Sequence, residues 1–247
     1  MLTPDETCDK VFGGRVSVIQ RRGGYRLSLD TLLLTAFVAP VMGGRVIDLG
    51  SGCGVVPFAL AAFYPTVECV GLELQQPMLA RARRALGLNP VQNRVSFVAG
   101  NVCDVSQSFQ PGSFDVVTCN PPYRRLKSGR PNPDRERYVA RHEIEAVLGD
   151  FVSAGAYLLR YRGRMALVYP AARAVELCSV MRGARVEPHR VRFVQSFSDT
   201  NATLVLVEGV KEGRSDLAVL PPLVIYRQEN VYSEEMLAVS DGTVFGG

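Results

Sequence analysis

The chain has 247 residues, of which 47% are hydrophobic and 21% are charged, and its formal net charge is +4. These values are ordinary for a globular protein, and no segment has the roughly 18 uninterrupted apolar residues that a membrane-spanning helix needs. The length fits one large α/β domain better than two small ones. Residues 1–10 contain three acids and no apolar run, so we expect no secretion leader and a cytoplasmic protein.

The cysteines and the basic residues indicate which kinds of site and ligand to expect. The six cysteines form no CxxC pair and mostly lie inside apolar runs, so we expect reduced thiols, no disulfide and no metal site. Nearly all the positive charge is arginine, because Lys10, Lys127 and Lys211 are the only lysines. Arginine suits phosphate contacts and stacking on bases, although a solvated arginine-rich surface explains this composition equally well.

The first 44 residues predict a short hairpin and a helix. Residues 16–19 form a β-rich run, and residues 21–25 indicate a turn because paired glycines permit positive φ angles. Apolar residues then recur at helical spacing over residues 29–37, with Ser28 or Asp30 available as the helix cap.

From residue 45 onward, short β-rich runs alternate with helical patterns. The predicted strands are residues 45–49, 67–73, 95–99, 114–119 and 165–169, and the predicted helices are residues 55–63, 77–86, 144–160 and 171–181. Near-continuous apolar strands separated by helices predict a doubly wound α/β fold with a mostly parallel sheet covered on both faces.

The last part of the chain predicts a different arrangement. Residues 191–196 and 203–210 are two strands with only a loop between them, which indicates a terminal antiparallel pair and brings the sheet to seven strands. Residues 221–226 resemble an extra edge segment. We therefore expect a hairpin and helix of residues 1–44 packed on a domain of residues 45–240, followed by a loose tail of residues 241–247.

A glycine-rich turn follows the first strand of the alternating region. Gly50, Gly52 and Gly54 have GxGxG spacing, and glycines let the backbone approach a ligand where a Cβ would collide. Val55 stands where a dinucleotide site would need its third glycine, and no phosphate-loop lysine is present. The spacing favours a nucleotide cofactor without phosphates, and the alternative is a turn that only joins strand to helix.

Polar side chains end or follow the next two strands. Glu73 ends the second strand, where a carboxylate can accept both hydroxyl groups of a ribose. Asn101 follows the third strand at the same edge, and its amide could meet the cofactor adenine. The alternatives are an exposed strand-end charge and ordinary turn chemistry. Leu74 and Val102, the next residues in each case, are included in the predicted cofactor site.

The stretch Phe114–Tyr123 is a buried strand that ends in the motif NPPY. An aromatic amine is a poor nucleophile because its lone pair is delocalised, so a catalyst has to hold both amine hydrogens. The side-chain oxygen of Asn120 and the carbonyl of Pro121 can supply two acceptors, and Pro121-Pro122 restricts the backbone. Tyr123 can stack on the acceptor ring, so the motif predicts a planar nitrogen as the group that reacts. The alternative is a strand terminator with a core tyrosine.

These motifs resemble those of the class I S-adenosylmethionine (SAM) dependent methyltransferases. The resemblance rests on Asp48-Leu-Gly-Ser-Gly-Cys-Gly54, Glu73 and Asn101. It implies SAM as the cofactor, with Ser51 and the glycines under the methionine moiety and Asp48 supporting the amino group through the turn. Asn120 is assigned to both the cofactor and the acceptor sites. Many members carry an acid where Asn101 stands.

The substrate has to be inferred from residues outside NPPY, because this motif serves adenine N6 and also a glutamine amide of release factors. A flipped base would have phosphates on both sides, and the segment after Tyr123 is rich in cations. A solvated basic loop is the alternative. We place five of these residues beside the substrate: Arg124, Arg125, Lys127, Arg130 and Arg141.

The whole chain resembles the bacterial enzymes that methylate N6 of adenosine 37 in a valine tRNA. The likeness runs through Tyr25–Asp30, NPPY, Arg130-Pro131 with Ala140–Glu143, and Pro221–Tyr226. It implies tRNA as the partner and places Tyr25, Ser28 and Asp30 near the cofactor. A protein glutamine methyltransferase, an enzyme for another RNA or DNA base and a non-catalytic RNA-binding module stay open. The sequence leaves the oligomeric state open, and we expect a monomer.

Overall fold

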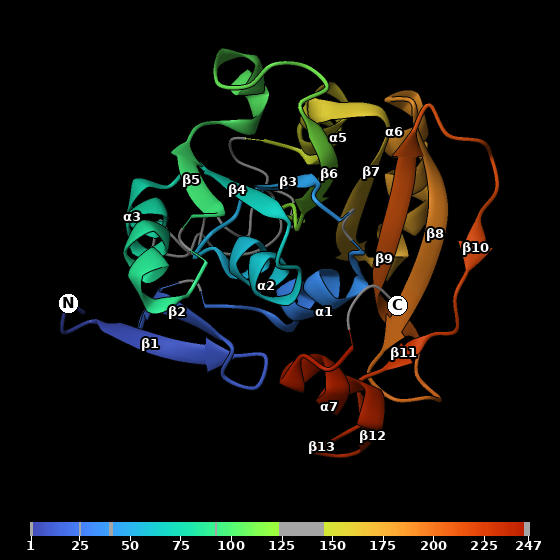
Figure 1. The fold of residues 1–247 in the computed structure, drawn as a ribbon. Coiled ribbons are helices and arrows are strands. Elements are labelled where there is room, and N and C mark those ends of the chain that lie inside the picture. Colours follow the sequence, from blue (N-terminus) through green and yellow to red (C-terminus); the bar gives the residue numbers. More distant parts are fainter. Residues whose placement is uncertain (1, 25, 40–41, 92, 124–145, 245–247) are drawn as a thin grey trace.

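A nine-stranded, mostly parallel sheet forms the centre of the computed structural model, which describes residues 2–24, 26–39, 42–91, 93–123 and 146–244. The strand order is β10-β8-β9-β7-β6-β3-β4-β5, and β11 lies beside β8 (Figure 1). Seven strands are long: β3 (Arg45–Leu49), β4 (Glu68–Glu73), β5 (Val95–Ala99), β6 (Phe114–Cys119), β7 (Leu159–Pro170), β8 (Val186–Gln195) and β9 (Ala202–Lys211). The expected doubly wound, mostly parallel α/β fold is confirmed, and the short strands β10 and β11 add two strands to the seven that the sequence predicts.

The direction of the strands explains where a ligand can bind. Strands β3, β4, β5, β6 and β7 run parallel, whereas β9 is antiparallel to both β7 and β8, as the expected terminal pair requires. The chain builds outward from β3 through β4 to β5 and then returns to the other side of β3 with β6. This reversal is a topological switch point, and open α/β sheets bind ligands beyond the carboxyl ends of the strands at such a point.

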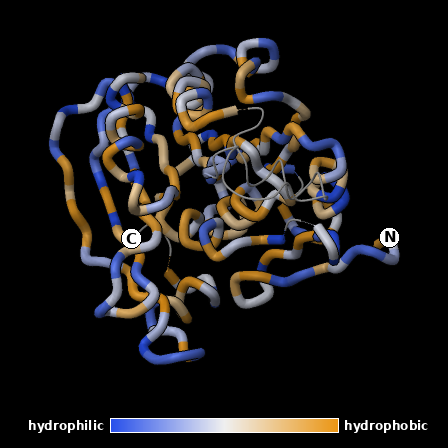
Figure 2. Tube along the Cα trace, turned by 180° about the vertical axis from the view of Figure 1, so that it is seen from behind, coloured by the Kyte–Doolittle hydropathy of each residue, from blue (hydrophilic) through white to orange (hydrophobic). Residues whose placement is uncertain are grey.

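Helices cover both faces of the sheet because successive strand residues point to opposite sides. Val46 belongs to the core cluster under α1 (Leu29–Phe37), α2 (Val55–Phe63) and α3 (Gln76–Ala85), whereas Ile47 belongs to the cluster under α5 (Leu148–Leu158) and α6 (Ala174–Gly183). Figure 2 shows hydrophobic and hydrophilic residues along the chain trace. Among the described helices, none has the length and apolar character to cross a membrane.

The N-terminal hairpin exists, but the turn that the sequence predicts at residues 21–25 follows the hairpin and does not close it. The expected turn is present, since the Gly24 N–H donates to the Arg21 carbonyl at 3.2 Å. Strand β1 (Glu6–Val11), however, pairs with β2 (Val16–Arg21) across a different turn at residues 12–15. Gly13 and Gly14 have φ values of 62° and 85° there, the conformation that glycine permits. The sequence of β1 hides the strand because its side chains, apart from buried Glu6, are exposed or half-buried.

A C-terminal unit joins this hairpin to the sheet. Short strands β10 (Ala218–Val219) and β11 (Leu223–Val224) run parallel to β8, and the hairpin β12 (Tyr226–Gln228) with β13 (Val231–Tyr232) leads into helix α7 (Glu234–Asp241). The sequence analysis missed α7, although Ser233 caps it by accepting a bond from the Met236 N–H at 3.0 Å. The backbone N–H of Gly13 donates to the Ser240 carbonyl at 3.0 Å, so α7 closes against the hairpin turn.

Candidate active site

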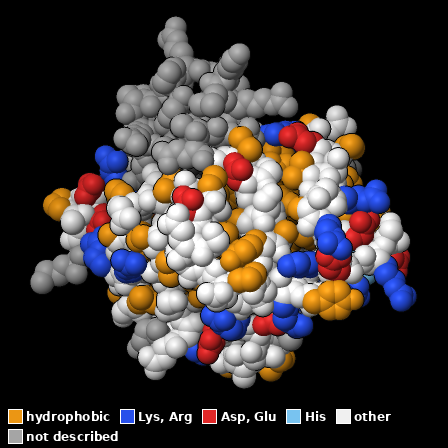
Figure 3. Space-filling view, turned by 90° about the horizontal axis from the view of Figure 1, so that it is seen from above, with side chains coloured by type: hydrophobic (Ala, Val, Ile, Leu, Met, Phe, Trp, Pro, Cys, Tyr) orange, Lys and Arg blue, Asp and Glu red, His pale blue; other side chains and the backbone are white. Residues whose placement is uncertain are grey.

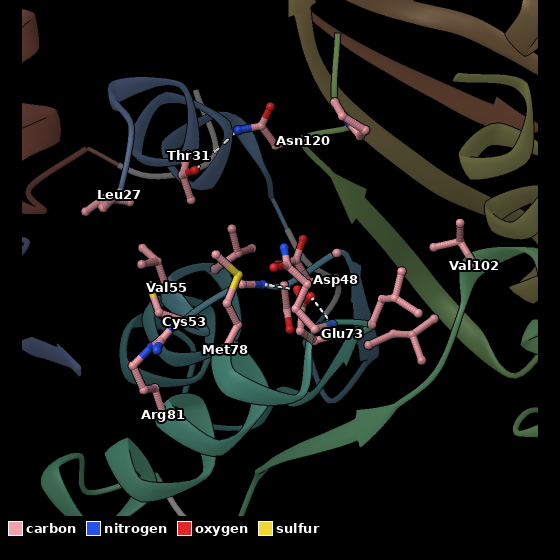
Figure 4. A pocket seen from close by; sticks show the side chains of 18 of the residues that line it. Leu27, Thr31, Asp48, Cys53, Val55, Glu73, Met78, Arg81, Val102 and Asn120 are labelled. Carbon is pink, nitrogen blue, oxygen red and sulfur yellow. Dashed lines mark hydrogen bonds between the residues drawn. The ribbon is translucent and has the colours of Figure 1, made fainter. Parts of the chain in front are cut away.

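An open cavity lies at the carboxyl edge of the sheet, at the switch point between β3 and β6. It holds about 1160 Å³ of empty space, part of it open to solvent. Figure 4 shows Asp48 and Glu73 on one side of this space and Asn120 on the other. Its wall includes most of the described residues that the sequence predicts for the cofactor: Asp48, Gly50, Ser51, Gly52, Glu73, Leu74, Asn101, Val102 and Asn120.

The glycine turn has the backbone conformation that its spacing predicts. The φ values of Gly50, Gly52 and Gly54 are 72°, 55° and 85°, all in the left-handed region that favours glycine. The N–H groups of Gly50 and Ser51 both donate to the Leu72 carbonyl of β4, at 2.9 and 3.0 Å. These bonds fix the turn against the neighbouring strand and leave its outer side facing the cavity.

Gly54 and Gly52 differ in the atoms that an added side chain would contact. A substitution at Gly54 should therefore affect mainly stability, and one at Gly52 mainly ligand binding. A Cβ at Gly54 would lie 2.5 Å from the Phe97 ring, whereas a Cβ at Gly52 would have nothing within 4 Å. We expect Gly54→Ala to lower the free energy of unfolding by about 2 to 4 kcal/mol, from overpacking and positive φ together. Gly52→Ala should cost only about 1 kcal/mol and instead weaken ligand binding in the cavity.

Urea unfolding followed by circular dichroism measures both losses in parallel. The two substitutions add the same methyl group to the same turn, so each serves as the control for the other. Equal losses of stability in the two variants would contradict the packing argument.

The carboxylate of Glu73 is held rigidly at the centre of the cavity wall. Its Oε2 accepts from the Gly52 N–H at 2.7 Å, and its Oε1 accepts from the Gln75 N–H at 2.8 Å. The side chain is buried. A carboxylate oxygen can accept more than one hydrogen bond, so this group can also receive hydroxyl donors from a ligand. Glu73 therefore links the glycine turn to the position that the sequence predicts for the ribose.

Asp48 lies beneath the turn and is also buried. Its Oδ1 accepts from the hydroxyl group of Thr118 on β6 at 2.7 Å. Burial raises the pKa of the Asp48 carboxyl to about 7, and the nearby negative charge of Glu73 acts in the same direction. The site therefore contains a carboxyl group that titrates near neutrality, and a cationic ligand would favour its charged form.

The raised pKa of Asp48 predicts how stability depends on pH. The folded protein binds this proton more tightly than the unfolded chain does, so the Asp48 contribution is most favourable below about pH 4 and is lost as pH rises toward 7. Between pH 5 and pH 8 we expect it to lower the free energy of unfolding by about 2 to 3 kcal/mol. Urea titrations at both pH values should show this loss in the wild type relative to Asp48→Asn, and a constant difference between the two proteins would refute it.

Asn101 lies on the cavity wall but its side chain also has a local role. The residue caps the 3₁₀ segment Val102–Gln107, and its Oδ1 accepts from the Cys103 N–H at 3.0 Å. This bond is the turn chemistry that the sequence analysis kept as an alternative. Contact between Asn101 and a cofactor adenine stays a prediction.

The NPPY segment leaves β6 directly beside the cavity. Asn120 and Pro122 line the wall, and Pro121 is buried. The Asn120 Nδ2 lies 3.4 Å from the Thr31 hydroxyl oxygen. Tyr123 is 38% exposed, so its ring is available for stacking. Pro121 and Tyr123 are not part of the cavity wall, and the acceptor role of the motif stays a prediction.

Two residues that the sequence analysis missed, Thr31 and Arg173, hydrogen-bond to the NPPY segment from other parts of the chain. Thr31 lines the cavity from the first turn of α1. Arg173 donates from its Nη1 to the Tyr123 carbonyl at 3.1 Å, and the Glu176 carboxylate receives two further bonds from the same guanidinium, both 2.7 Å. Neither residue lies near NPPY in the sequence, so no local pattern could have indicated it.

The residues that resemblance placed near the cofactor have different positions. Ser28 occupies the N-cap position of α1 without capping a backbone N–H, and its Oγ lies 3.5 Å from the Thr31 hydroxyl. The Asp30 carboxylate accepts a bond from Tyr123, and burial raises its pKa. Neither residue is part of the cavity wall. Six further predicted residues lie outside the described part of the chain: Tyr25, Arg124, Arg125, Lys127, Arg130 and Arg141.

Within the described residues, no group of three or more His, Cys, Asp or Glu side chains could hold a metal ion. The cavity instead combines a glycine turn, two buried carboxylates and an asparagine amide. The carboxylates can bind hydroxyl and cationic groups of a ligand. The oxygen of the asparagine amide can accept a hydrogen bond from a second molecule.

Comparison with known proteins identifies relatives of similar size. The family model named methyltransferase small domain matches residues 28–181. A tRNA1(Val) (adenine(37)-N6)-methyltransferase from Porphyromonas gingivalis is 28% identical over 200 residues, 78% of either chain. A protein of the same name from Tolumonas auensis is 25% identical over 232 residues, 90% of this chain and 91% of its own.

A solved structure supports the architecture independently of these names. The crystal structure of a predicted O-methyltransferase from Agrobacterium tumefaciens has a TM-score of 0.72 and 21% sequence identity. The match covers 88% of this chain and 98% of that chain. At this level of identity the likeness shows the shared fold alone.

Proposed function

The chain belongs to the methyltransferase small domain family, and from this premise we propose that it transfers a methyl group from SAM to the N6 amine of an adenine in tRNA. The observation that carries the proposal is the position of Asn120 and Pro122 on the wall of the cavity that also contains Glu73 and the glycine turn. In this proposal one cavity holds a nucleoside cofactor and, through Asn120 on its wall, an oxygen acceptor for a planar amine.

The cavity wall fits SAM in its chemistry. Glu73 would accept the ribose hydroxyls, and the open space above Gly52 leaves room for the methionine moiety. Bound there, SAM would supply an electrophilic methyl group, whose carbon–sulfur bond breaks with its electrons left on sulfur as the substrate nitrogen bonds the methyl carbon.

The residues of this chain contribute mainly by orientation. The Asn120 side-chain oxygen and the Pro121 carbonyl would each accept one amine hydrogen, which turns the nitrogen lone pair toward the donor. Preorganised acceptors of this kind also stabilise the positive charge that develops on the nitrogen. The surplus proton leaves to water after transfer, so the reaction needs no strong base. Tyr123 would stack on the acceptor ring.

The choice of tRNA as the substrate rests on the relatives and on the sequence. The two relatives described above are named for adenine 37 of a valine tRNA, and they align over most of this chain. Cations and acids are interspersed over the described surface seen in Figure 3. The cation-rich segment 124–141 lies outside the described residues, and its contact with phosphates stays a prediction from the sequence.

Nucleoside analysis tests the proposed function directly. The protein is incubated with labelled SAM and unmodified tRNA, and the tRNA is digested to nucleosides. We expect the label in N6-methyladenosine, and label in guanosine or no label in RNA would overturn the proposal. A parallel reaction with a peptide release factor tests the alternative glutamine acceptor. Label in that protein alone would replace adenine by a glutamine amide.

A further inference from the structure

The first turn of helix α1 contacts the NPPY segment at two points. Thr31 places its hydroxyl oxygen 3.4 Å from the Nδ2 of Asn120, a bond drawn in Figure 4. The preceding residue, Asp30, accepts a side-chain hydrogen bond from Tyr123. Two consecutive residues of one helical turn therefore hold the first and last residues of the motif.

Helix α1 is a firm support for these contacts. Leu33 and Leu34 are buried in the core that α1 shares with α2. At the other end of the helix, Arg190 donates to the Phe37 carbonyl at 2.6 Å, and its guanidinium lies 4.3 Å from the centre of the Phe37 ring. Because the helix is fixed at its buried face and at its C-terminal end, the residues of its first turn are held in defined positions.

We propose that Thr31 is a positioning residue that fixes the orientation of the Asn120 amide. An asparagine amide has an oxygen that accepts and a nitrogen that donates, and only the oxygen can hold a hydrogen of the acceptor amine. The Thr31 hydroxyl accepts from Nδ2, and its own proton can be donated to the Ser28 Oγ 3.5 Å away, so the Oδ1 is left for the substrate. A flipped amide would present N–H groups to the amine hydrogens, which is repulsive.

This role deepens the proposed function and rests on it for the identity of the amine. The contact also exists in the free protein, so Thr31 fixes the orientation of the Asn120 amide before any substrate binds. Catalysis and the state of the free amide can therefore be measured separately.

The kinetic test compares two valine variants on the same helix. Thr31→Val removes the hydroxyl group at Asn120, whereas Thr35→Val removes a hydroxyl group that donates to the Thr31 backbone carbonyl at 2.7 Å. We expect kcat on tRNA to fall about tenfold in Thr31→Val, the effect of about 1.4 kcal/mol, with KM and the Kd for SAM within about twofold of the wild type. Thr35→Val should retain its kcat, and Thr31→Ser should recover most of it.

A second measurement needs no activity. In protein labelled with ¹⁵N-asparagine, the pair of side-chain NH₂ signals that disappears in Asn120→Asp identifies the Asn120 amide. We expect Thr31→Val to shift this pair and Thr35→Val to leave it in place. An unshifted pair, or equal kcat values in the two valine variants, overturns the role of Thr31. If the wild type methylates no tRNA adenine, the proposed function fails, while the NMR signals still decide whether Thr31 holds Asn120.

Discussion

Replacing Asn120 by alanine is expected to lower kcat by a factor of about 100 to 1000, because a preorganised acceptor contributes roughly that much when charge develops in a buried site. The Kd for SAM should change by less than about twofold, since the amide lies across the cavity from Glu73 and bonds Thr31 instead. Single-turnover reactions with excess protein, labelled SAM and tRNA measure the chemical step, and isothermal titration calorimetry measures SAM binding.

The control for this variant is Asn201→Ala, which removes the same amide group from an exposed residue outside the cavity wall. It should retain the wild-type kcat. A parallel loss of SAM affinity in Asn120→Ala would place the side chain against the cofactor rather than the acceptor amine. A loss of less than about fivefold in kcat would show that the Pro121 carbonyl alone can orient the amine.

The fold could be predicted from the sequence wherever the pattern of apolar residues follows directly from burial in the core. The alternation of Val46 and Ile47 between two core clusters is a direct result of strand geometry, so the buried central strands were readable from sequence. Strand β1 and helix α7 were missed because they lie at the periphery. Most side chains of β1 are exposed or half-buried, and α7 buries only Met236 and Val239 along one side. Weak burial leaves a weak pattern.

In the candidate site, likewise, residues in local motifs could be predicted from the sequence, whereas contacts between distant residues could not. The glycine turn, Glu73 and NPPY each lie next to the end of a strand, and parallel strands bring these ends to one edge, so their assembly follows from topology. The contact between Thr31 and Asn120 joins residues 89 positions apart, and that between Arg173 and Tyr123 joins residues 50 positions apart. Such pairs depend on the packing of whole helices, which no single segment specifies.

Replacing Glu73 by alanine should raise the Kd for SAM about 100-fold or more. Two charge-assisted hydrogen bonds to the ribose would be lost, each contributing about 1.5 to 3 kcal/mol, and about 2.7 kcal/mol corresponds to 100-fold in affinity. The variant also removes the acceptor for the Gly52 and Gln75 N–H groups, which loosens the turn beneath the cofactor. Calorimetric titration with SAM measures the loss.

Glu68→Ala is the matched control, because Glu68 begins the strand that Glu73 ends and its side chain is 67% exposed. It should bind SAM like the wild type. At saturating SAM, Glu73→Ala should regain much of its kcat, since the carboxylate acts on binding and Asn120 acts on the transferred group. If kcat stayed low at saturation while Kd was unchanged, Glu73 would have to act on the reacting atoms. The cofactor would then lie in a different orientation across the glycine turn.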